Sequence, residues 1–109
     1  SMEEIHHTQK LDAPSGTAIT LAKQILAFLP TKTSWVNHAT TDATALEIES
    51  QRIDPAPGTH TVAYHAAVDS IEIKHTAHNR MGFALGAVLA AEFIAGKKGE
   101  YNMQQVLGL

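Results

Sequence analysis

Three segments in the middle of the chain alternate apolar and polar residues with a period of two, the pattern of half-buried β-strands. They are Leu46–Glu49, Thr59–Ala66 and Ser70–Thr76. Turn-forming residues around Pro55 and Gly58 separate the first segment from the second. Met2 to His7 is short and is expected to be a further strand. These patterns predict a sheet, and we expect the three central strands to pair mostly antiparallel.

Two longer segments have helical patterns instead. Apolar residues recur at helical spacing from Ser15, a natural N-cap, to Leu29, where Pro30 ends the run. The second helix is expected from about Asn79 to Ala95 and is apolar on nearly every side. Thr31 to Ala45 is expected to be a loop or a short strand. The prediction is an α+β fold, with a mixed open sheet and helices packed on one face.

Composition narrows the possible functions. The chain of 109 residues is the size of one domain, and a net charge of -3 gives no basic field for nucleic acid or anionic lipid. No apolar run approaches the ~18 residues of a membrane span. With no cysteine, the chain has no disulfide, thiolate metal site or cysteine nucleophile, which fits a reducing cytoplasm. We expect neither nucleic acid nor a membrane as a partner.

The densest chemistry lies between Ile5 and Thr17. His6 and Lys10 are four residues apart, which places them on one side of either an extended or a helical backbone. Together they offer a group that titrates near neutrality and a fixed cation. His7 is one residue further along an extended chain than His6 and is therefore expected to point to the opposite side. The pair suits proton transfer to an anionic substrate.

A possible anion site follows directly. Ser15, Gly16 and Thr17 open the first predicted helix, where free N–H groups and the helix dipole attract a carboxylate or phosphate. Gly16 lets a ligand oxygen approach the backbone without a side chain in the way. Taken alone, such a segment is more often an ordinary helix cap, and a His-His pair is more often structural. Their combination with Lys10 favours a binding site.

The other histidines are weaker candidates. His75 and His78 are three apart, but the nearest carboxylate, Glu72, points to the opposite face of its strand, so we expect no metal site. His60 and His65 lie on opposite faces of one predicted strand and are expected to be surface or interface residues.

The segment from Glu4 to Ala18, with Glu-Ile-His-His, Lys10 and Asp-Ala-Pro-Ser-Gly-Thr-Ala, resembles the signature of the dihydrodipicolinate reductases of lysine and diaminopimelate biosynthesis. Gly58–His60 and Thr76–Ala84 also resemble the later part of that enzyme. The family has an N-terminal Rossmann domain for the nucleotide and a C-terminal domain for substrate binding and tetramerisation. Only the second resembles residues 1–109, since the glycines here never form G-x-G-x-x-G.

The resemblance implies roles for single residues. His6 corresponds to the proton donor or acceptor, Lys10 to the second acid group and His7 to a substrate contact. Gly16 and Thr17, after Ser15, correspond to backbone donors to a substrate carboxylate. Arg80 corresponds to an arginine near the cleft between cofactor and substrate.

The resemblance also implies a reaction and partners. The full-length enzyme would use NADPH or NADH to reduce 4-hydroxy-tetrahydrodipicolinate, a small dicarboxylate, to tetrahydrodipicolinate. We expect a homotetramer, and we expect the chain without its Rossmann domain to bind no nucleotide and to be inactive. The alternative is a stand-alone carboxylate-binding or oligomerisation module without catalysis.

Overall fold

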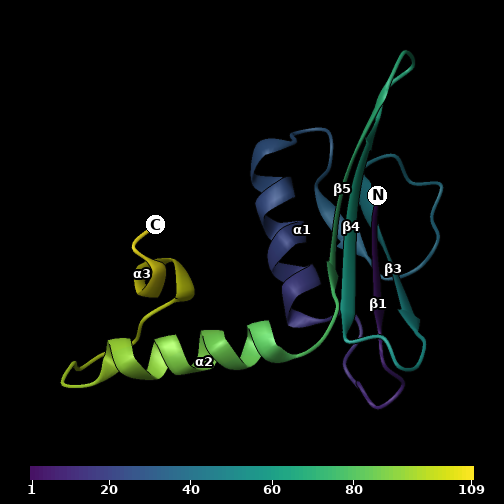
Figure 1. Cartoon of the computed structure of the whole chain (residues 1–109). Coiled ribbons are helices and arrows are strands. Elements are labelled where there is room, and N and C mark those ends of the chain that lie inside the picture. The colour runs from purple at the N-terminus through teal and green to yellow at the C-terminus, as the bar shows by residue number, and fades with distance from the viewer. The chain divides into compact units, whose positions relative to one another are not determined.

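Residues 1–109 are all described by the computed structural model, and they fall into two units, Ser1–His78 and Asn79–Leu109. The first unit holds one sheet and one long helix (Figure 1). Its elements, in chain order, are β1 (Met2–His6), α1 (Gly16–Phe28), β2 (Ser34–Val36), β3 (Ala45–Arg52), β4 (Gly58–His65) and β5 (Ser70–Ala77).

The sheet is mixed and has five strands in the order β2-β3-β1-β4-β5. β1 and β2 both pair parallel with β3, whereas β4 pairs antiparallel with β1 and with β5. The expectation that β3, β4 and β5 form a mostly antiparallel group is therefore wrong for β3. The connection through α1 carries the chain back to the same end of the sheet, which favours parallel strands, whereas the short turn between β4 and β5 requires antiparallel ones.

α1 lies against one face of β1 and β3 (Figure 1). The core of the first unit is the layer between them, which consists of Met2, Ala18, Ala22, Leu46 and Ile48. Trp35 and Val62 pack against its border. Successive residues of β1 alternate between this layer and the other side, so the odd-numbered Glu3 and Ile5 are less buried than Met2, Glu4 and His6. The predicted mixed sheet with a helix on one face is confirmed.

α1 begins and ends where the sequence predicts. Ser15 is its N-cap, and the Ser15 hydroxyl accepts a hydrogen bond from the Ala18 N–H at 3.1 Å. Leu29 is its C-cap, followed by Pro30. The expected strands also agree with the observed ones to within a few residues, and the segment expected to be a loop or short strand contains the three-residue β2.

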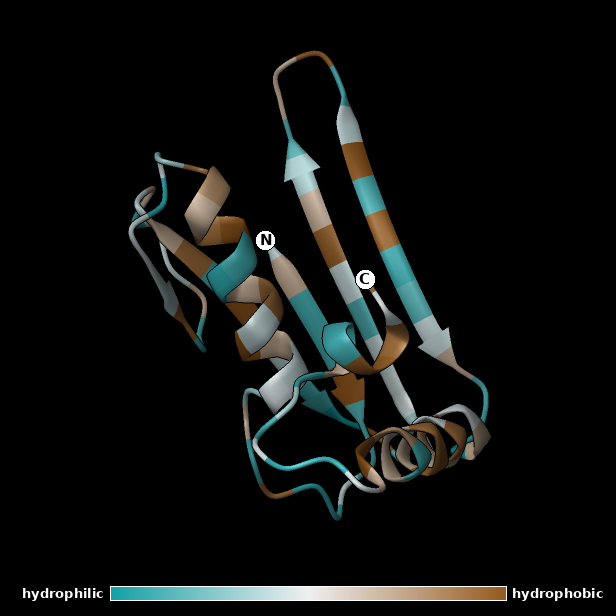
Figure 2. Ribbon diagram, turned by 90° about the vertical axis from the view of Figure 1, so that its left-hand side faces the viewer, coloured by the Kyte–Doolittle hydropathy of each residue, from teal (hydrophilic) through white to brown (hydrophobic).

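The second unit contains α2 (Met81–Ile94) and the short α3 (Met103–Leu107). α2 has apolar side chains on nearly all sides, and none of its residues is buried (Figure 2). α3 begins with a capping box, in which Asn102 and Gln105 exchange hydrogen bonds. Phe93 and Tyr101 pack edge to face, with 5.2 Å between their ring centroids. No helix of the chain has the length and hydropathy that crossing a membrane requires.

Candidate functional site

The register of the sheet places polar residues in one row on the face that carries α1. Ser50 on β3 pairs with Glu4 on β1, Glu4 pairs with His60 on β4, and His60 pairs with His75 on β5. Since directly paired residues point to the same face of a sheet, the four side chains lie side by side. A polar row thus continues the apolar core toward the end of the sheet where α1 begins.

Glu4 is at the centre of this row and is 1% exposed. Its Oε1 atom accepts hydrogen bonds from the Ser15 N–H at 3.0 Å, the Ser50 hydroxyl at 2.8 Å and Arg52 Nη2 at 3.3 Å. The Ser15 hydroxyl donates to the Oε2 atom. Burial alone would raise the pKa of Glu4, but these hydrogen bonds outweigh it and lower the pKa below its ordinary value. Glu4 is therefore a buried, ionised carboxylate.

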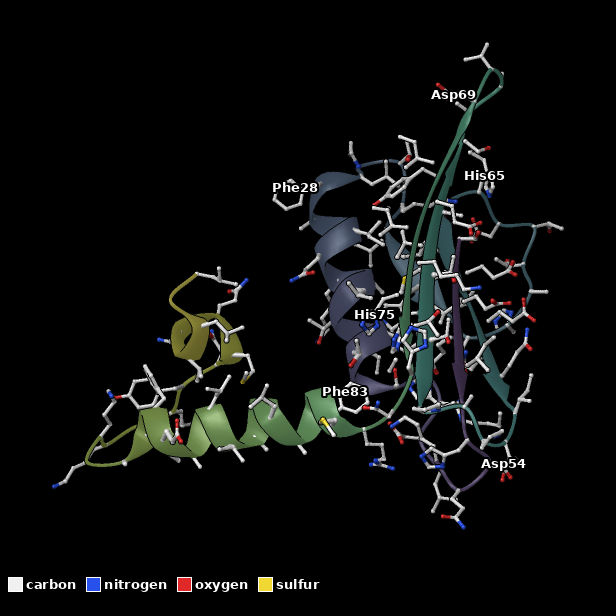
Figure 3. The ribbon with its side chains drawn as sticks, viewed as in Figure 1. Phe28, Asp54, His65, Asp69, His75 and Phe83 are labelled. Atoms are coloured by element: carbon white, nitrogen blue, oxygen red, sulfur yellow. The ribbon has the colours of Figure 1, made fainter.

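Two histidines flank that carboxylate. His60 Nε2 lies 3.7 Å and His6 Nδ1 lies 3.8 Å from Glu4 Oε2, and the two imidazole rings meet edge to face with 5.0 Å between centroids. His60 Nε2 is also 3.3 Å from the Ser15 hydroxyl. The His60 side chain is only 14% exposed, so the expectation of a surface position for His60 is wrong, while that of an interface position stays a prediction. His65, at the opposite end of β4 from the loop with Asp54, is exposed as expected (Figure 3).

Both histidines are poor proton acceptors in this setting. Burial lowers the pKa of His6; Glu4 raises it, and the positive charges of His60, Lys10 and Arg52 lower it further. Burial likewise lowers the pKa of His60, against the opposing effect of Glu4. The His6 ring also lies against Gly58, where a Cβ atom would be 3.2 Å from His6 Nε2. His6 is thus a close-packed imidazole that is mostly neutral at pH 7.

Arg52 connects this cluster to the loop between β1 and α1. Besides Glu4, its guanidinium donates to the backbone carbonyls of Lys10 and Asp12. At the other side of the loop, Thr8 donates through its N–H to Asp54 at 2.8 Å and also through its hydroxyl. The loop that carries Lys10 is therefore held at several points by Arg52, the last residue of β3, and by Asp54, which follows β3.

Lys10 and His7 lie on this loop, but not as their spacing predicts. β1 ends at His6, and the Lys10 N–H donates to the His7 carbonyl at 3.2 Å, which makes a turn. The assumption of an extended or helical backbone from His6 to Lys10 is therefore wrong. The Lys10 ammonium is 3.0 Å from the Asp12 carboxylate, and its charge still reaches His6, whose pKa it lowers. His7 is half-buried.

The start of α1 adds backbone donors. The N–H groups of Ser15 and Ala18 are taken by Glu4 and by the Ser15 hydroxyl. Gly16 and Thr17, both exposed, are the other residues of the first turn, whose N–H groups find no carbonyl partner within a helix. Space is open in front of Gly16, where a Cβ atom would meet nothing within 4 Å. The first turn therefore presents two exposed N–H groups, and the expectation that they bind an anion stays a prediction.

Arg80 is not one of the first-unit residues that form this cluster. It lies in the second unit, at the N-cap position of α2, and its side chain makes no capping hydrogen bond. Its assignment to a cofactor cleft stays a prediction.

The nitrogen and oxygen atoms of Glu4, His6 and His60 lie within 4.8 Å of one another, which is close enough to consider a metal ion. The donor set does not fit one. Both carboxylate oxygens of Glu4 already accept hydrogen bonds, and one of the donors is the cationic Arg52. A divalent cation would have to displace this guanidinium and would lie beside its charge. The arrangement is better described as a hydrogen-bonded cluster.

Sequence reasoning missed the roles of Glu4, Ser50, Arg52 and His60. Glu4 had one available signal, because it shares the parity of Met2 and His6 and therefore points into the core. A charged residue at a core position is rare and is usually paired. Ser50, Arg52 and His60, however, lie 46 to 56 residues further along the chain than Glu4 and can be identified as its partners only from the register.

The lowered pKa values of His6 and His60 predict that the free energy of unfolding depends on pH. Because their pKa values are lower in the folded chain than the ordinary 6.5, the unfolded chain binds more protons just below pH 6.5. The free energy of unfolding should therefore fall as the pH is lowered from 7.5 through 6.5 and toward the folded pKa values. Urea denaturation at several pH values, followed by Trp35 fluorescence, measures it.

The matched variants are His60→Gln and His38→Gln, the latter at an exposed position. His60→Gln should reduce the loss of stability between pH 7.5 and 5.5, whereas His38→Gln should keep it. Equal slopes in all three proteins would contradict the assignment to the buried histidines.

Comparison with known proteins gives consistent relatives. Residues 1–107 match the protein family described as dihydrodipicolinate reductase, C-terminus. The 4-hydroxy-tetrahydrodipicolinate reductase of Christiangramia forsetii is 52% identical over 107 residues, which is 97% of this chain and 44% of that protein. The enzyme of the same name from Alkalilimnicola ehrlichii is 41% identical, over 97% of this chain and 43% of its own length. The chain thus spans less than half the length of these relatives.

A solved structure agrees in fold. The dipicolinate-bound dihydrodipicolinate reductase from Paenisporosarcina sp. TG-14 superposes with a TM-score of 0.63 and 26% sequence identity. The match covers 90% of this chain and 40% of that protein.

Proposed function

The chain belongs to the family of dihydrodipicolinate reductase C-terminal domains, and on this basis we propose that it forms the substrate-binding and proton-donating half of a 4-hydroxy-tetrahydrodipicolinate reductase. The single observation that carries the proposal is the juxtaposition of three features at one end of the sheet. These are the open start of α1 at Gly16, the Lys10 ammonium and the buried His6 imidazole.

Each feature has a part in binding and proton transfer. A carboxylate of the substrate would accept hydrogen bonds from the N–H groups of Gly16 and Thr17, and it would compete with Asp12 for the Lys10 ammonium. His7, half-buried on the same loop as Lys10, is the further substrate contact that the family suggests. The solved relative named above has dipicolinate, a planar dicarboxylate, bound to it, which supports a dicarboxylate as the ligand here.

Proton transfer is assigned to His6 and Lys10. His6 is mostly neutral at pH 7 because its pKa is lowered, chiefly by burial, so an imidazolium formed there gives up its proton readily. The Lys10 ammonium balances the charge of the dicarboxylate and is the second acid group. The nicotinamide of NADPH or NADH, when bound, supplies the hydride. The connection from β1 to α1 is not a glycine-rich loop of the kind that holds a nucleotide, since the first glycine of the chain is Gly16, the first residue of α1.

The separation of the two binding tasks can be tested on the chain itself. Isothermal titration calorimetry with pyridine-2,6-dicarboxylate should show weak binding, and NADPH measured in parallel should show none. The dicarboxylate should bind weakly because the exposed contacts at the start of α1 remain in water, where each is worth only ~0–1 kcal/mol. Tight NADPH binding would contradict the assignment of the nucleotide to another domain.

A matched variant makes the dicarboxylate result specific. Lys10→Ala should weaken the binding of pyridine-2,6-dicarboxylate, whereas Lys23→Ala, at an exposed position further along α1, should leave it unchanged. Dicarboxylate binding that depends equally on both lysines, or on neither, would favour a non-specific charge effect and would refute the proposed site.

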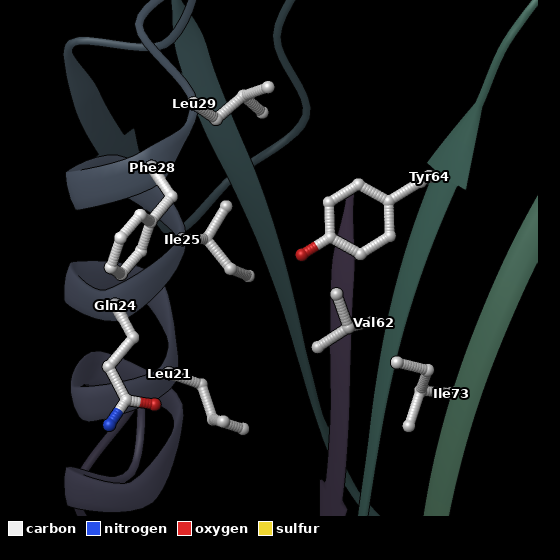
Figure 4. Close-up of a pocket in the computed structure, with 8 residues that line it drawn as sticks. All are labelled: Leu21, Gln24, Ile25, Phe28, Leu29, Val62, Tyr64 and Ile73. Carbon is white, nitrogen blue, oxygen red and sulfur yellow. The ribbon is translucent and has the colours of Figure 1, made fainter.

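We also propose that the domain assembles into a homotetramer. The support is apolar surface on the first unit. Ile71 and Ile73 of β5 are 62% and 63% exposed, and β5 is an edge strand with an unpaired side. Next to them, a hollow of about 350 Å³ lies between α1 and the two last strands (Figure 4). It is lined by Leu21, Gln24, Ile25, Phe28, Leu29, Val62, Tyr64 and Ile73.

Sedimentation velocity tests the assembly. We expect the purified chain to sediment as an oligomer at tens of micromolar, and Ile73→Lys to shift it toward the monomer because it places a charge in the apolar surface. Lys74→Glu, on the other face of β5, is the control and should sediment like the parent chain. A monomeric parent chain would contradict assembly by this domain alone.

A further inference from the structure

Glu4 is the one buried carboxylate of the cluster, and the reaction scheme above gives it no part. Its Oε1 atom joins three elements, since it accepts hydrogen bonds from Ser15 at the start of α1 and from Ser50 and Arg52 on β3. A buried charge is costly unless it is fully hydrogen-bonded, and here the donors come from the start of α1 and from β3. Glu4 therefore fixes the position of the first turn of α1 relative to the sheet.

The Oε2 atom also accepts hydrogen bonds from Ser15, through the N–H at 3.2 Å and through the hydroxyl, and in addition it faces two imidazoles. It lies 3.7 Å from His60 Nε2 and 3.8 Å from His6 Nδ1. His6 Nδ1 is buried without a hydrogen-bond partner, and buried polar atoms are rarely left so. The Glu4 carboxylate is an acceptor within a short movement of it. An Nδ1–H directed at Glu4 would set the tautomer of the imidazole and hold the ring in place.

The charges around the two rings give Glu4 a second effect. His60 on β4, Lys10 on the loop and Arg52 on β3 oppose a positive charge on His6. For His60 the opposing groups are His75 on β5 and Lys10. Glu4 on β1 alone favours the protonated form of both rings. Its charge therefore counteracts the burial that makes these histidines poor bases.

We propose that Glu4 is a positioning residue of this site: its carboxylate fixes the start of α1 through Ser15, and its Oε2 atom also faces the imidazoles of His6 and His60. The inference rests on the proposed function only for its meaning in catalysis. By fixing Ser15, Glu4 places the N–H groups of Gly16 and Thr17 where a substrate carboxylate can meet them. By facing His6, it keeps that imidazole able to carry a proton inside a buried site.

The test compares Glu4→Gln with Glu3→Gln. Glutamine keeps the shape of the side chain and removes one negative charge in both variants. Glu3 is the neighbouring residue on the same strand, but it points to the other face and accepts a hydrogen bond from the Gln51 side chain. Titration of the histidine ring C–H signals by NMR in the labelled chain should show the His6 and His60 titrations moved to lower pH in Glu4→Gln. In Glu3→Gln the two titrations should stay where they are in the parent chain.

Titrations of His6 and His60 that are unchanged in a folded Glu4→Gln chain would overturn the proposal. If this variant does not fold, the parent chain still decides. Carbon-detected NMR of the Glu4 carboxyl carbon reports on its ionisation. The Glu4 carboxyl should stay ionised throughout the pH range in which His6 and His60 take up protons. A Glu4 carboxyl that takes up its proton before either histidine would refute the proposal.

The geometric part has its own measurement. Glu4→Asp keeps the charge but withdraws the carboxylate by one methylene from Ser15. The Ala18 amide, which is held by the Ser15 hydroxyl, should then exchange its hydrogen faster, and Gly16 and Thr17 amide signals should move. Glu3→Asp should change none of them. Unchanged exchange and signals in Glu4→Asp would contradict the role in fixing the start of α1.

None of these readouts needs a substrate, so they separate this inference from the proposed function. A parent chain that fails to bind pyridine-2,6-dicarboxylate would count against the proposed function and leave the titrations valid. In a full-length reductase containing this domain, Glu4→Gln should also move the limb of the pH–rate profile that belongs to His6 to lower pH. A profile identical to that of Glu3→Gln would contradict the catalytic meaning of the position.

Discussion

A full-length reductase containing this domain should turn over about 10²–10⁴ times more slowly when His6 or Lys10 is replaced by Ala, which is the usual effect of removing a positioned proton-transfer group. His6 lies buried at the end of β1, next to the Glu4 carboxylate, and no other imidazole of the first unit has the same contacts with Gly58. Lys10 supplies the cation that the substrate carboxylate needs. Steady-state kinetics at saturating NADPH measures the loss.

Two exposed residues of the same types are the controls. His38→Ala and Lys23→Ala remove an imidazole and an ammonium away from the cluster and should keep turnover within about twofold of the parent enzyme, as surface substitutions rarely perturb a fold. Circular dichroism of all four variants checks their secondary structure. A His6→Ala enzyme that runs at the parent rate would show that the proton donor lies elsewhere.

The second large effect is on stability. Arg52→Ala should lower the free energy of unfolding by about 3 kcal/mol, which raises the equilibrium constant for unfolding about a hundredfold, because it leaves the Glu4 carboxylate buried without its cation. The Glu4 side chain is fully buried and that of Arg52 is 19% exposed, so the lost interaction is poorly screened by water. Urea denaturation followed by fluorescence reports on the first unit, since the only tryptophan, Trp35, packs against its core.

The pH dependence identifies the cause. Hydrogen bonds from Ser15, Ser50 and Arg52 lower the pKa of Glu4 in the folded chain, so Glu4 adds stability above its unfolded value, 4.5, and this is lost as the pH falls through the folded pKa. The destabilisation by Arg52→Ala should therefore be larger at pH 7 than at pH 3. Arg52→Met keeps the aliphatic part of the side chain and should still show most of the destabilisation of Arg52→Ala at pH 7. If Arg52→Met instead has the stability of the parent chain, the destabilisation in Arg52→Ala comes from lost packing and not from an unpaired charge.

Local elements of the fold could be predicted from the sequence because their causes are local. Ser15 and Pro30 bound α1 through a side-chain cap and a missing N–H, and both effects act within one helical turn. The alternation along Ser70–Ala77 likewise indicates a strand, since neighbouring side chains point to opposite faces. The long-range pairing was not predictable in this way. β1 lies between β3 and β4, and no local pattern states that Met2 pairs with both Ile48 and Val62.

The site divides along the same line. The open start of α1 at Gly16 and Thr17 follows from a short stretch of sequence, as do the candidate groups His6 and Lys10. The spacing of His6 and Lys10, however, led to a wrong expectation about the backbone between them. β1 ends at His6 because the chain must turn there to reach α1, and the turn places Lys10 beside Asp12.

The sequence by itself therefore determined the kinds of element, the helix start and the chemical groups near it, because propensity, capping and periodicity act over a few residues. Only the tertiary structure decided that Glu4, Ser50, Arg52 and His60 form one cluster around the start of α1. Their meeting depends on the register of three strands. A shift of one residue in any of them would turn its side chain to the other face of the sheet.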